Sequence, residues 1–387
     1  MQGLFSSRLA AIAVEGNLRK LPQVQHRGEQ IIRLDAPHKT MLNLSSNDYM
    51  GLASNKELIA EFETNCNHLT TPYSASSSRL LTGNFELYGQ LEDKLCQLYN
   101  SEAALVFNSG YHANIGILPA ITSARSLIVA DKLIHASLID GARLCAGKLL
   151  RFLHNDLQHL EQILSAHAAQ HDLVVVVVES IYSMDGDCAN LPYLVGLKKR
   201  YPNLILYVDE AHAVGAMGAT GLGYSEQCGC VAKIDILVGT FGKALASVGA
   251  YAICNSELKE WLVNKMRPLI FSTALPPINL LWTLHVLEHL AGLNKERQHL
   301  ARLGKRLRAG IGGTSLISCS HIVPLIVGDS ELTVALAQQL QNEGFYLLPV
   351  RPPTVPKGTS RLRISLNSAI SMADLERLIS IIRQKLA

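Results

Sequence analysis

Short runs of apolar, often β-branched residues recur along the first two thirds of the chain. Within each run the apolar residues are continuous rather than alternating, which is typical of strands covered on both faces of a sheet. Segments with helical patterns, such as residues 156–170 and 191–200, separate the runs and are long enough to cross between parallel strands. The sequence therefore predicts an α/β fold with a mostly parallel central sheet. The runs are residues 104–107, 126–130, 173–178, 204–208 and 236–238.

After about residue 275 the pattern changes to long helical stretches mixed with few strands. Helical patterns cover residues 279–310 and 331–342, and a strand-like run covers residues 322–327. A closing strand over residues 361–365 and a helix over residues 373–385 follow. This predicts a second, smaller α/β layer. We therefore expect an N-terminal helix or arm over residues 1–40, a large domain over 41–278 and a small C-terminal domain over 279–387.

Composition narrows the class of protein. The chain has 387 residues, of which 48% are hydrophobic and 17% charged, so it can bury a substantial core. The formal net charge is only +3 and no basic run stands out, which argues against a nucleic-acid partner. The longest purely apolar run, residues 173–178, is far shorter than the roughly 20 residues of a membrane-spanning helix. A small-molecule enzyme with no membrane partner is the class that remains.

The cysteines and the N-terminal sequence help to predict where in the cell the protein is located. Eight cysteines are scattered along the chain, a pattern that suits reduced thiols. Near the N-terminus Glu15 directly follows a short apolar stretch, and no cleavage segment of the secretory kind is visible. We therefore expect a cytoplasmic protein.

Polar residues follow the apolar runs at the points where the expected strands end. In parallel α/β sheets ligands bind at these carboxyl ends. Gly110 and Tyr111 stand between a strand and a helix, where free backbone N–H groups and the helix dipole can hold a phosphate. Taken alone, such a glycine turn is more often structural. The chemically rich strand ends are residues 108–114, 131–135, 179–183, 209–212 and 240–243.

Two of these ends carry Asp209 with His212 and Lys243. Each has an ordinary interpretation, since a lone Asp is often a helix cap and a lone Lys a solvated surface charge. An amine, a carboxylate, two histidines and a phosphate-type turn together at one sheet edge are what pyridoxal 5'-phosphate requires. The lysine bonds to its aldehyde, the aspartate keeps its pyridine nitrogen protonated, and N–H and hydroxyl groups hold its phosphate. The sequence thus predicts a pyridoxal-phosphate enzyme.

From about residue 40 to its C-terminus, the chain resembles the α-oxoamine synthase family of fold-type I pyridoxal-phosphate enzymes. The motifs that carry this resemblance are LSSNDY at residues 44–49, HASL at 135–138, SMDGD at 183–187, DEAH at 209–212, TFGK at 240–243 and FSTALPP at 271–277. The resemblance implies a large domain built on the central sheet and a small C-terminal domain. It also implies a homodimer with its active site at the subunit interface.

The resemblance assigns roles to the residues that match the family's motifs. It implies Lys243, His135 and Asp209 as catalytic residues: Lys243 bonds to the cofactor, His135 stacks on its ring and Asp209 contacts the pyridine nitrogen. His212 would contact the ring hydroxyl, and Thr273 the phosphate of the neighbouring subunit. No metal site is expected. The remaining cofactor-binding residues would be Gly110, Tyr111, Ser183 and Thr240.

The same resemblance implies substrate contacts. Asn47 and Arg363 match positions that bind the amino-acid carboxylate, although Arg363 also fits a solvent-facing strand residue. Three features depart from the family's pattern: a serine-rich loop at residues 74–78, Ala244 after the lysine and Tyr88 where many relatives have histidine. These changes lie in loops beside the expected cofactor site.

Members of this family join an amino acid to an acyl thioester with loss of carbon dioxide. The segment RPPTVPKGTSRLR at residues 351–363 is most similar to the biotin-pathway member, which implies L-alanine and a pimeloyl thioester of coenzyme A or an acyl carrier protein. Thr354 and Arg19 match substrate-contacting positions of that member. The alternatives are relatives of the glycine C-acetyltransferase, 5-aminolevulinate synthase or serine palmitoyltransferase kind, and a non-catalytic scaffold relative, which the presence of Lys243 disfavours.

Overall fold

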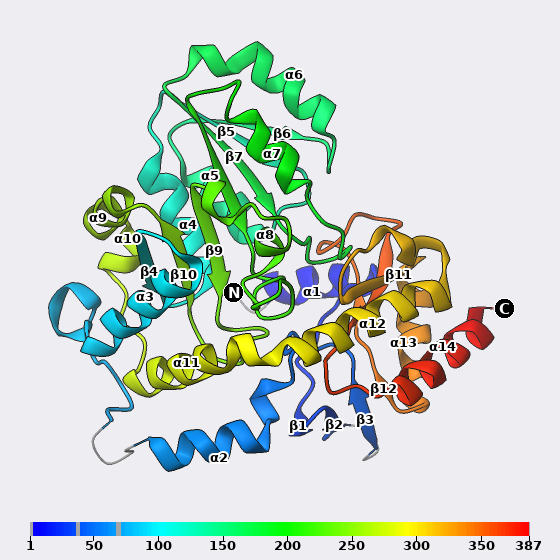
Figure 1. The fold of residues 1–387 in the computed structure, drawn as a ribbon. Helices are drawn as coiled ribbons and strands as arrows, with labels where there is room; N and C mark the ends of the chain where they lie inside the picture. Colours follow the sequence, from blue (N-terminus) through cyan, green and yellow to red (C-terminus); the bar gives the residue numbers. More distant parts are fainter. Residues whose placement is uncertain (1–2, 36–38, 67–70, 387) are drawn as a thin grey trace. The chain divides into compact units, whose positions relative to one another are not determined.

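The structure is a computed structural model that describes residues 3–35, 39–66 and 71–386 (Figure 1). By their internal contacts the residues form a large unit, Asn55–Ser183 with Cys188–Arg297, and a small unit, Met1–Ser54 with Met184–Asp187 and Gln298–Ala387. Of the expected N-terminal arm, residues 1–2 and 36–38 lie outside the described residues. The expected domain boundaries at residues 41 and 279 stay a prediction.

A seven-stranded sheet forms the centre of the large unit, in the order β4-β10-β9-β8-β7-β5-β6 (Figure 1). Strand β10 runs antiparallel to both of its neighbours, whereas the other neighbouring strands are parallel. The predicted mostly parallel sheet is therefore confirmed. The strands are β4 (Ala103–Phe107), β5 (Ser126–Asp131), β6 (Lys148–Phe152), β7 (Leu173–Glu179), β8 (Leu204–Asp209), β9 (Ile236–Thr240) and β10 (Ala250–Cys254).

The strands in the middle of this sheet are apolar because both of their faces are covered. Every residue of β5 and β9 is buried, and residues 174–178 of β7 are at most 1% exposed. Burying such side chains from water is the main favourable contribution to folding. One close approach requires a glycine: a Cβ on Gly239 would lie 2.3 Å from Cζ of Tyr251 on the adjacent strand.

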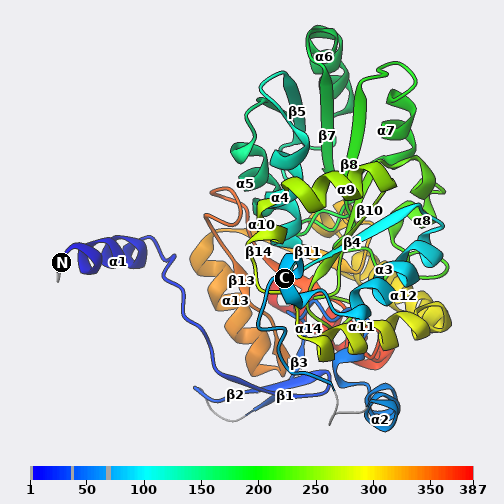
Figure 2. The same ribbon diagram turned by 90° about the vertical axis from the view of Figure 1, so that its left-hand side faces the viewer.

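Helices connect the strands, and several begin at a polar side chain that caps the first turn. Ser109 accepts a hydrogen bond from the backbone N–H of His112 at 3.1 Å, and Asp156 accepts one from His159 at 2.8 Å. Such caps contribute roughly 1 kcal/mol each. Figures 1 and 2 show α4 and α5 side by side. The helices of this unit are α2 (Lys56–Asn65), α3 (Glu86–Tyr99), α4 (Gly110–Ile121), α5 (Ala136–Leu144), α6 (Leu157–His167), α7 (Leu191–Leu197), α8 (Tyr224–Gln227), α9 (Ser256–Lys265), α10 (Arg267–Ile270) and α11 (Pro277–His289).

The small unit contains two short sheets. In the first, β1 (Val24–Arg27), β2 (Gln30–Arg33) and β3 (Thr40–Asn43) are antiparallel and β12 (Phe345–Tyr346) pairs parallel with β3. In the second, β14 (Ser360–Ser365) lies between β11 (Ile322–Gly328) and β13 (Pro349–Val350). The helices are α1 (Leu4–Val14), α12 (Asn294–Ile311), α13 (Ser330–Asn342) and α14 (Met372–Leu386), and α12 begins in the large unit. A 3-10 turn at Leu290–Leu293 separates α11 from α12 within the expected helical stretch 279–310.

Two sequence expectations concern the chain as a whole. No helix in the described part of the chain combines the length and the apolarity needed to span a membrane. Six cysteines are free thiols, but Cys188 and Cys319 are disulfide-bonded, so the expectation of reduced thiols is wrong for these two. A cytoplasmic location stays a prediction.

Candidate active site

A cavity of about 160 Å³ lies within the large unit, where the carboxyl ends of its strands meet. Two larger hollows of about 800 and 860 Å³ lie elsewhere in this unit, but neither includes Lys243 or Asp209. The chemistry of the lining therefore singles out the small cavity. It is lined by Gly110, Tyr111, Asn114, His135, Ser137, Glu179, Asp209, Ala211, His212, Thr240 and Lys243.

Lys243 reaches the cavity from a tight turn that follows β9. The hydroxyl of Thr240, the last residue of β9, donates to the carbonyl of Gly249 at 3.0 Å and accepts from the N–H of Gly242 at 3.2 Å. These bonds close the turn and fix the backbone around the lysine. Nζ of Lys243 lies 2.8 Å from Nε2 of His212, so the two predicted residues meet.

Asp209 is the last residue of β8 and is only 6% exposed. Its carboxylate accepts hydrogen bonds from Nδ2 of Asn114 at 2.8 Å and from the N–H of Ala211 at 2.9 Å. Asn114 is itself fixed, because it donates to Ser137 at 2.9 Å and accepts from the Tyr207 hydroxyl at 2.7 Å. This buried network holds the carboxylate in one orientation.

His135 precedes α5 and contributes an imidazole to the cavity wall. Its Nδ1 lies 2.7 Å from Oγ of Ser137. Burial lowers the pKa of His135, and Lys243 lowers it further, while Asp209 acts in the opposite direction. The lowered pKa favours the neutral form of this ring at physiological pH.

Glu179 is a residue of this cavity that the sequence reasoning did not assign. It ends β7, pairs with Asp209 of β8 and is 2% exposed. Burial raises the pKa of the Glu179 carboxyl well above its usual value, and Asp209 raises it further, while Lys243 acts in the opposite direction. Among the described atoms, Oε1 of Glu179 is buried and has no hydrogen-bond partner. The signal in the sequence was its position directly after the run at residues 173–178.

The hydrogen-bond donors and acceptors of these residues match the chemical groups of pyridoxal phosphate. An amine, a fixed carboxylate and a neutral imidazole surround one cavity, and α4 begins at its edge with Gly110, where first-turn N–H groups can bind a phosphate. A Cβ on Gly110 would meet only Cβ of Thr240, at 4.0 Å, so the chain leaves room at this helix end. Tyr111 donates from its hydroxyl to Asp140 at 2.7 Å.

Two of the expected cofactor residues do not line the cavity. Ser183 is buried, beyond the end of β7, and Thr273 pairs with Ser78 in an isolated bridge and accepts through its carbonyl from Asn108 at 2.5 Å. Contact of Thr273 with the phosphate of a neighbouring subunit stays a prediction.

The expected carboxylate-binding residues meet in the small unit. Nη1 of Arg363 donates to Oδ1 of Asn47 at 3.2 Å and to the hydroxyl of Ser365 at 2.6 Å, and Nη2 donates to the hydroxyl of Tyr49 at 3.0 Å. The Tyr49 hydroxyl in turn donates to Asn47 at 2.9 Å. These three neutral oxygen atoms orient the guanidinium.

The structure also brings together two further residues that match substrate-contacting positions. Nη2 of Arg19 donates to Oγ1 of Thr354 at 2.7 Å, although the two residues are far apart in sequence. Arg351 donates to the carbonyl of Gly16, so a second bond joins the same two segments. Both Arg19 and Thr354 are exposed and belong to the small unit.

Comparison with known proteins agrees with this site. The model of the family described as aminotransferase class I and II matches residues 39–382. The 8-amino-7-oxononanoate synthase of Haemophilus ducreyi is 52% identical over 385 residues, which covers 97% of this chain and 99% of that protein. The chain belongs to the α-oxoamine synthase family. It is accordingly a pyridoxal-phosphate-dependent enzyme of the acyltransferase type.

Solved structures extend the likeness to the fold. Serine palmitoyltransferase from S. paucimobilis, with a bound PLP–myriocin aldimine, has a TM-score of 0.88 at 26% identity, over 98% of this chain and 95% of that chain. The 8-amino-7-oxononanoate synthase from Francisella tularensis has a TM-score of 0.73 at 26% identity, over 89% and 98% of the two chains. The predicted fold-type I architecture of this α-oxoamine synthase is thus confirmed.

Proposed function

We propose that this α-oxoamine synthase condenses L-alanine with a pimeloyl thioester to give 8-amino-7-oxononanoate, carbon dioxide and the free thiol of coenzyme A or of an acyl carrier protein. The observation that carries this proposal is the 52% identity to an 8-amino-7-oxononanoate synthase along nearly the whole of both chains. The contact between Arg19 and Thr354 supports it, because both match substrate-contacting positions of that enzyme.

The reaction makes one carbon–carbon bond and breaks one carbon–sulfur and one carbon–carbon bond. The Cα of alanine loses its proton and bonds to the acyl carbonyl carbon, while the carbon–sulfur bond breaks and the thiol leaves. The bond from Cα to the carboxylate then breaks to release carbon dioxide, and Cα takes up a proton. Pyridoxal phosphate, when bound, would supply an acceptor for the electron pair that loss of the proton and loss of carbon dioxide leave at Cα.

The residues of the cavity supply positioning and proton transfer. We propose that Nζ of Lys243 accepts the proton that leaves Cα, because Lys243 supplies the amine that lines the cavity. This Nζ lies 2.8 Å from Nε2 of His212. Asp209 would hold a proton on the pyridine nitrogen through its fixed carboxylate, and neutral His135 would lie against the ring. Arg363 and Asn47 would bind the alanine carboxylate through a charge-assisted hydrogen bond.

A second candidate, a serine palmitoyltransferase-like activity, is favoured by the higher TM-score of that enzyme, 0.88 against 0.73. A TM-score compares backbones, whereas substrate choice depends on side chains that line the substrate path. Both solved enzymes are 26% identical to this chain, well below the 52% of the H. ducreyi protein. Sequence identity therefore supports the alanine and pimeloyl pair over serine and palmitoyl.

A substrate panel tests the proposal. We expect kcat/KM to be highest for L-alanine with a pimeloyl thioester when alanine, glycine and serine are each combined with pimeloyl, succinyl, acetyl and palmitoyl thioesters. A tenfold or greater preference for glycine with a short acyl group, or for serine with palmitoyl, would overturn the proposed substrates and leave the cofactor chemistry intact.

A variant at Arg19 tests recognition of the distal pimeloyl carboxylate. Loss of a hydrogen bond to a charged group costs about 1.5–3 kcal/mol, so Arg19→Gln should lower kcat/KM for the pimeloyl thioester by roughly ten- to a hundredfold and leave the acetyl thioester nearly unchanged. Arg8→Gln on α1 is the matched control. Equal losses for both thioesters would contradict a role in carboxylate recognition.

A further inference from the structure

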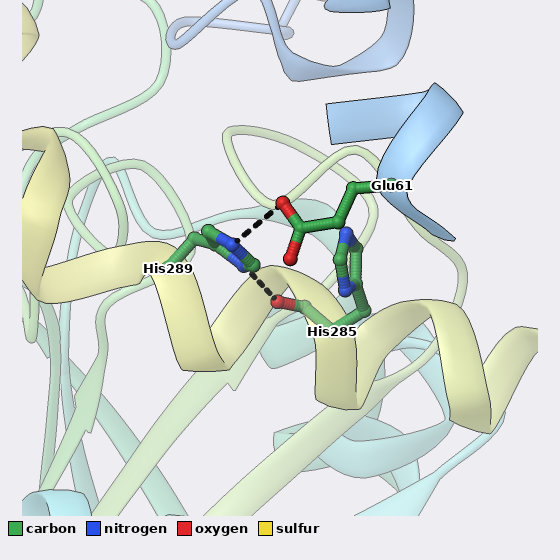
Figure 3. A group of neighbouring side chains, drawn as sticks. All are labelled: Glu61, His285 and His289. Carbon is green, nitrogen blue, oxygen red and sulfur yellow. Dashed lines mark hydrogen bonds and ion pairs between the residues drawn. The ribbon is translucent and has the colours of Figure 1, made fainter. Parts of the chain in front are cut away.

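Two helices of the large unit bring a carboxylate and two imidazoles together away from the cofactor cavity. Glu61 lies on α2, and His285 and His289 lie one turn apart on α11. One potential ligand atom from each residue lies within 4.8 Å of the other two, and this is the one such group in the part of the chain that the structure describes. Figure 3 shows the Glu61 carboxylate between the two imidazole rings.

The hydrogen bonds of the two histidines prepare them as ligands. Nδ1 of His289 lies 2.9 Å from the carbonyl of His285, and Nε2 of His285 lies 3.0 Å from the carbonyl of Leu58. A carbonyl oxygen only accepts, so these two nitrogens carry the N–H and the opposite nitrogen of each ring carries the lone pair. A backbone carbonyl that holds the second nitrogen is the usual support of a metal-binding histidine.

His289 and Glu61 present a nitrogen and an oxygen to one another. Nε2 of His289 lies 3.2 Å from Oε2 of Glu61. A cation bound to both atoms would hold them at this separation. The separation of 3.2 Å is close to the ~3.4 Å between two ligands of a tetrahedral zinc ion with bonds of about 2.1 Å.

His285 and the exposure of the cluster favour binding of a cation. His285 is 8% exposed, and its ring centroid lies 4.6 Å from that of His289, so a second nitrogen donor stands beside the pair. The side chains of His289 and Glu61 are 35% and 50% exposed, and His285 and Glu288 border a hollow of about 800 Å³. An ion can therefore reach the group from solvent.

We propose that Glu61, His285 and His289 form a zinc site that fastens α2 to α11. Two imidazoles and a carboxylate are a ligand set that zinc accepts in a tetrahedral arrangement, with water in the fourth position. The ordinary alternative is an ion pair between protonated His289 and Glu61, with His285 as a hydrogen-bonded core residue.

The site is structural rather than part of the acyl-transfer chemistry. Helix α11 also holds the turn after Lys243, since Nε1 of Trp282 donates to the carbonyl of Ala246 at 2.8 Å and the hydroxyls of Thr283 and Ser247 lie 2.8 Å apart. Zinc would stabilise this helix pair in the folded protein, because an ion that binds only the folded state raises its stability. The proposal does not depend on which amino acid or acyl group the enzyme uses.

Equilibrium dialysis of the chelator-treated holoenzyme against Zn²⁺ at neutral pH, with metal counted by mass spectrometry, tests the site. We expect wild type to bind one zinc ion more than Glu61→Gln or His289→Gln, or to bind it at least tenfold more tightly, and zinc to raise the Tm of wild type alone. Glu63→Gln on α2 and Glu288→Gln on α11 are matched controls that should bind as wild type does. Zinc bound by thiols or by the cofactor contributes equally to wild type and to the four variants, so it does not affect the comparison between them.

Two results would overturn the proposal: zinc binding by wild type that equals binding by both cluster variants, or a loss of binding in the control variants as large as in the cluster variants. Glu61 is half exposed, so Glu61→Gln keeps the measurement interpretable even where His289→Gln lowers the stability of the fold. Circular dichroism of each variant without metal confirms that it is folded.

Discussion

Two neighbouring carboxyl groups in the cavity have different surroundings. Asp209 accepts two hydrogen bonds, from Asn114 and Ala211. Glu179 pairs with it across the sheet, and burial raises the pKa of Glu179 well above its usual value, with Asp209 raising it further. We therefore expect Glu179 to be the protonated member of the pair.

Asp209→Asn tests the proposed contact of Asp209 with the pyridine nitrogen. The variant should still bind cofactor but lose turnover, because removal of one member of a buried charge pair costs about 3–5 kcal/mol, or roughly a hundredfold to several thousandfold in rate. The measurement is kcat with alanine and a pimeloyl thioester, and Asp172→Asn, at an exposed site, is the control. Activity close to wild type would mean that another group stabilises the pyridine nitrogen.

Glu179→Gln tests the protonated member through pH. The pKa of Glu179 is raised in the folded protein, so above the usual value of 4.5 the unfolded chain releases this proton while the folded protein keeps it. The free energy of unfolding of wild type therefore falls as the pH rises from 4.5 through the folded pKa. Glutamine does not titrate, so the variant lacks this fall and its stability relative to wild type should grow with pH, by up to about 1.4 kcal/mol per pH unit.

Denaturant unfolding of the cofactor-free proteins between about pH 5 and 8 measures this difference. Glu63→Gln, at an exposed site on α2, should differ from wild type by an amount that does not change with pH. A difference between Glu179→Gln and wild type that is equally flat would show that Glu179 is ionised in the folded protein.

At the scale of elements, Tyr88 shows how a departure from the family's pattern is accommodated. It lies on α3, is 1% exposed and accepts from the N–H of Leu275 at 2.8 Å, while the Arg79 guanidinium lies 3.9 Å from its ring centroid. The hydroxyl thus joins α3 to the turn that precedes α11. Arg79 begins a π-helix, Arg79–Gly83, and forms an ion pair with Glu92 at 2.8 Å.

Tyr88→Phe should lower the free energy of unfolding by about 1–3 kcal/mol, because the buried N–H of Leu275 loses its acceptor. Chemical denaturation measures this change. Tyr73→Phe is the control, since Tyr73 is 67% exposed and should change stability by less than about 0.5 kcal/mol. An unchanged stability of Tyr88→Phe would mean that water replaces the phenol.

The elements also show what sequence could and could not predict. Strands β7, β8 and β9 were predicted because burial on both faces requires continuous apolar runs. Strand β6 was missed, since it is an edge strand with exposed Lys148 and Arg151 that breaks this pattern. The antiparallel direction of β10 depends on the chain's return path, which apolar pattern does not encode.

Some residues of the candidate sites could likewise be predicted from the sequence, and others could not. Strand ends indicated Asp209 and Lys243, because a polar residue directly after an apolar run reaches the sheet edge. Glu179 has the same position, but only its pairing with Asp209 and its burial distinguish it from a helix cap. Glu61 meets His285 and His289 through the packing of two helices that are distant in sequence, so no motif indicated them.

At the scale of the whole molecule, the N-terminal helix α1 carries exposed apolar side chains. Phe5, Leu9 and Ile12 of α1 are 59%, 52% and 42% exposed, although apolar side chains of this size are usually covered. The family resemblance implies a homodimer. We expect light scattering after size exclusion to give a mass about twice the 42.2 kDa of one chain. A monomer at micromolar concentration would contradict this expectation.

Lys243, in the cavity at the strand ends of the large unit, is the residue on which we expect the enzyme to carry pyridoxal phosphate. Borohydride reduction of the purified enzyme, followed by proteolysis and mass spectrometry of the peptides, locates the attached cofactor. We expect the reduced cofactor on the peptide that contains Lys243, and no covalent cofactor in the folded Lys243→Ala protein. Cofactor attached to a different lysine of the wild-type chain would show that this assignment is wrong.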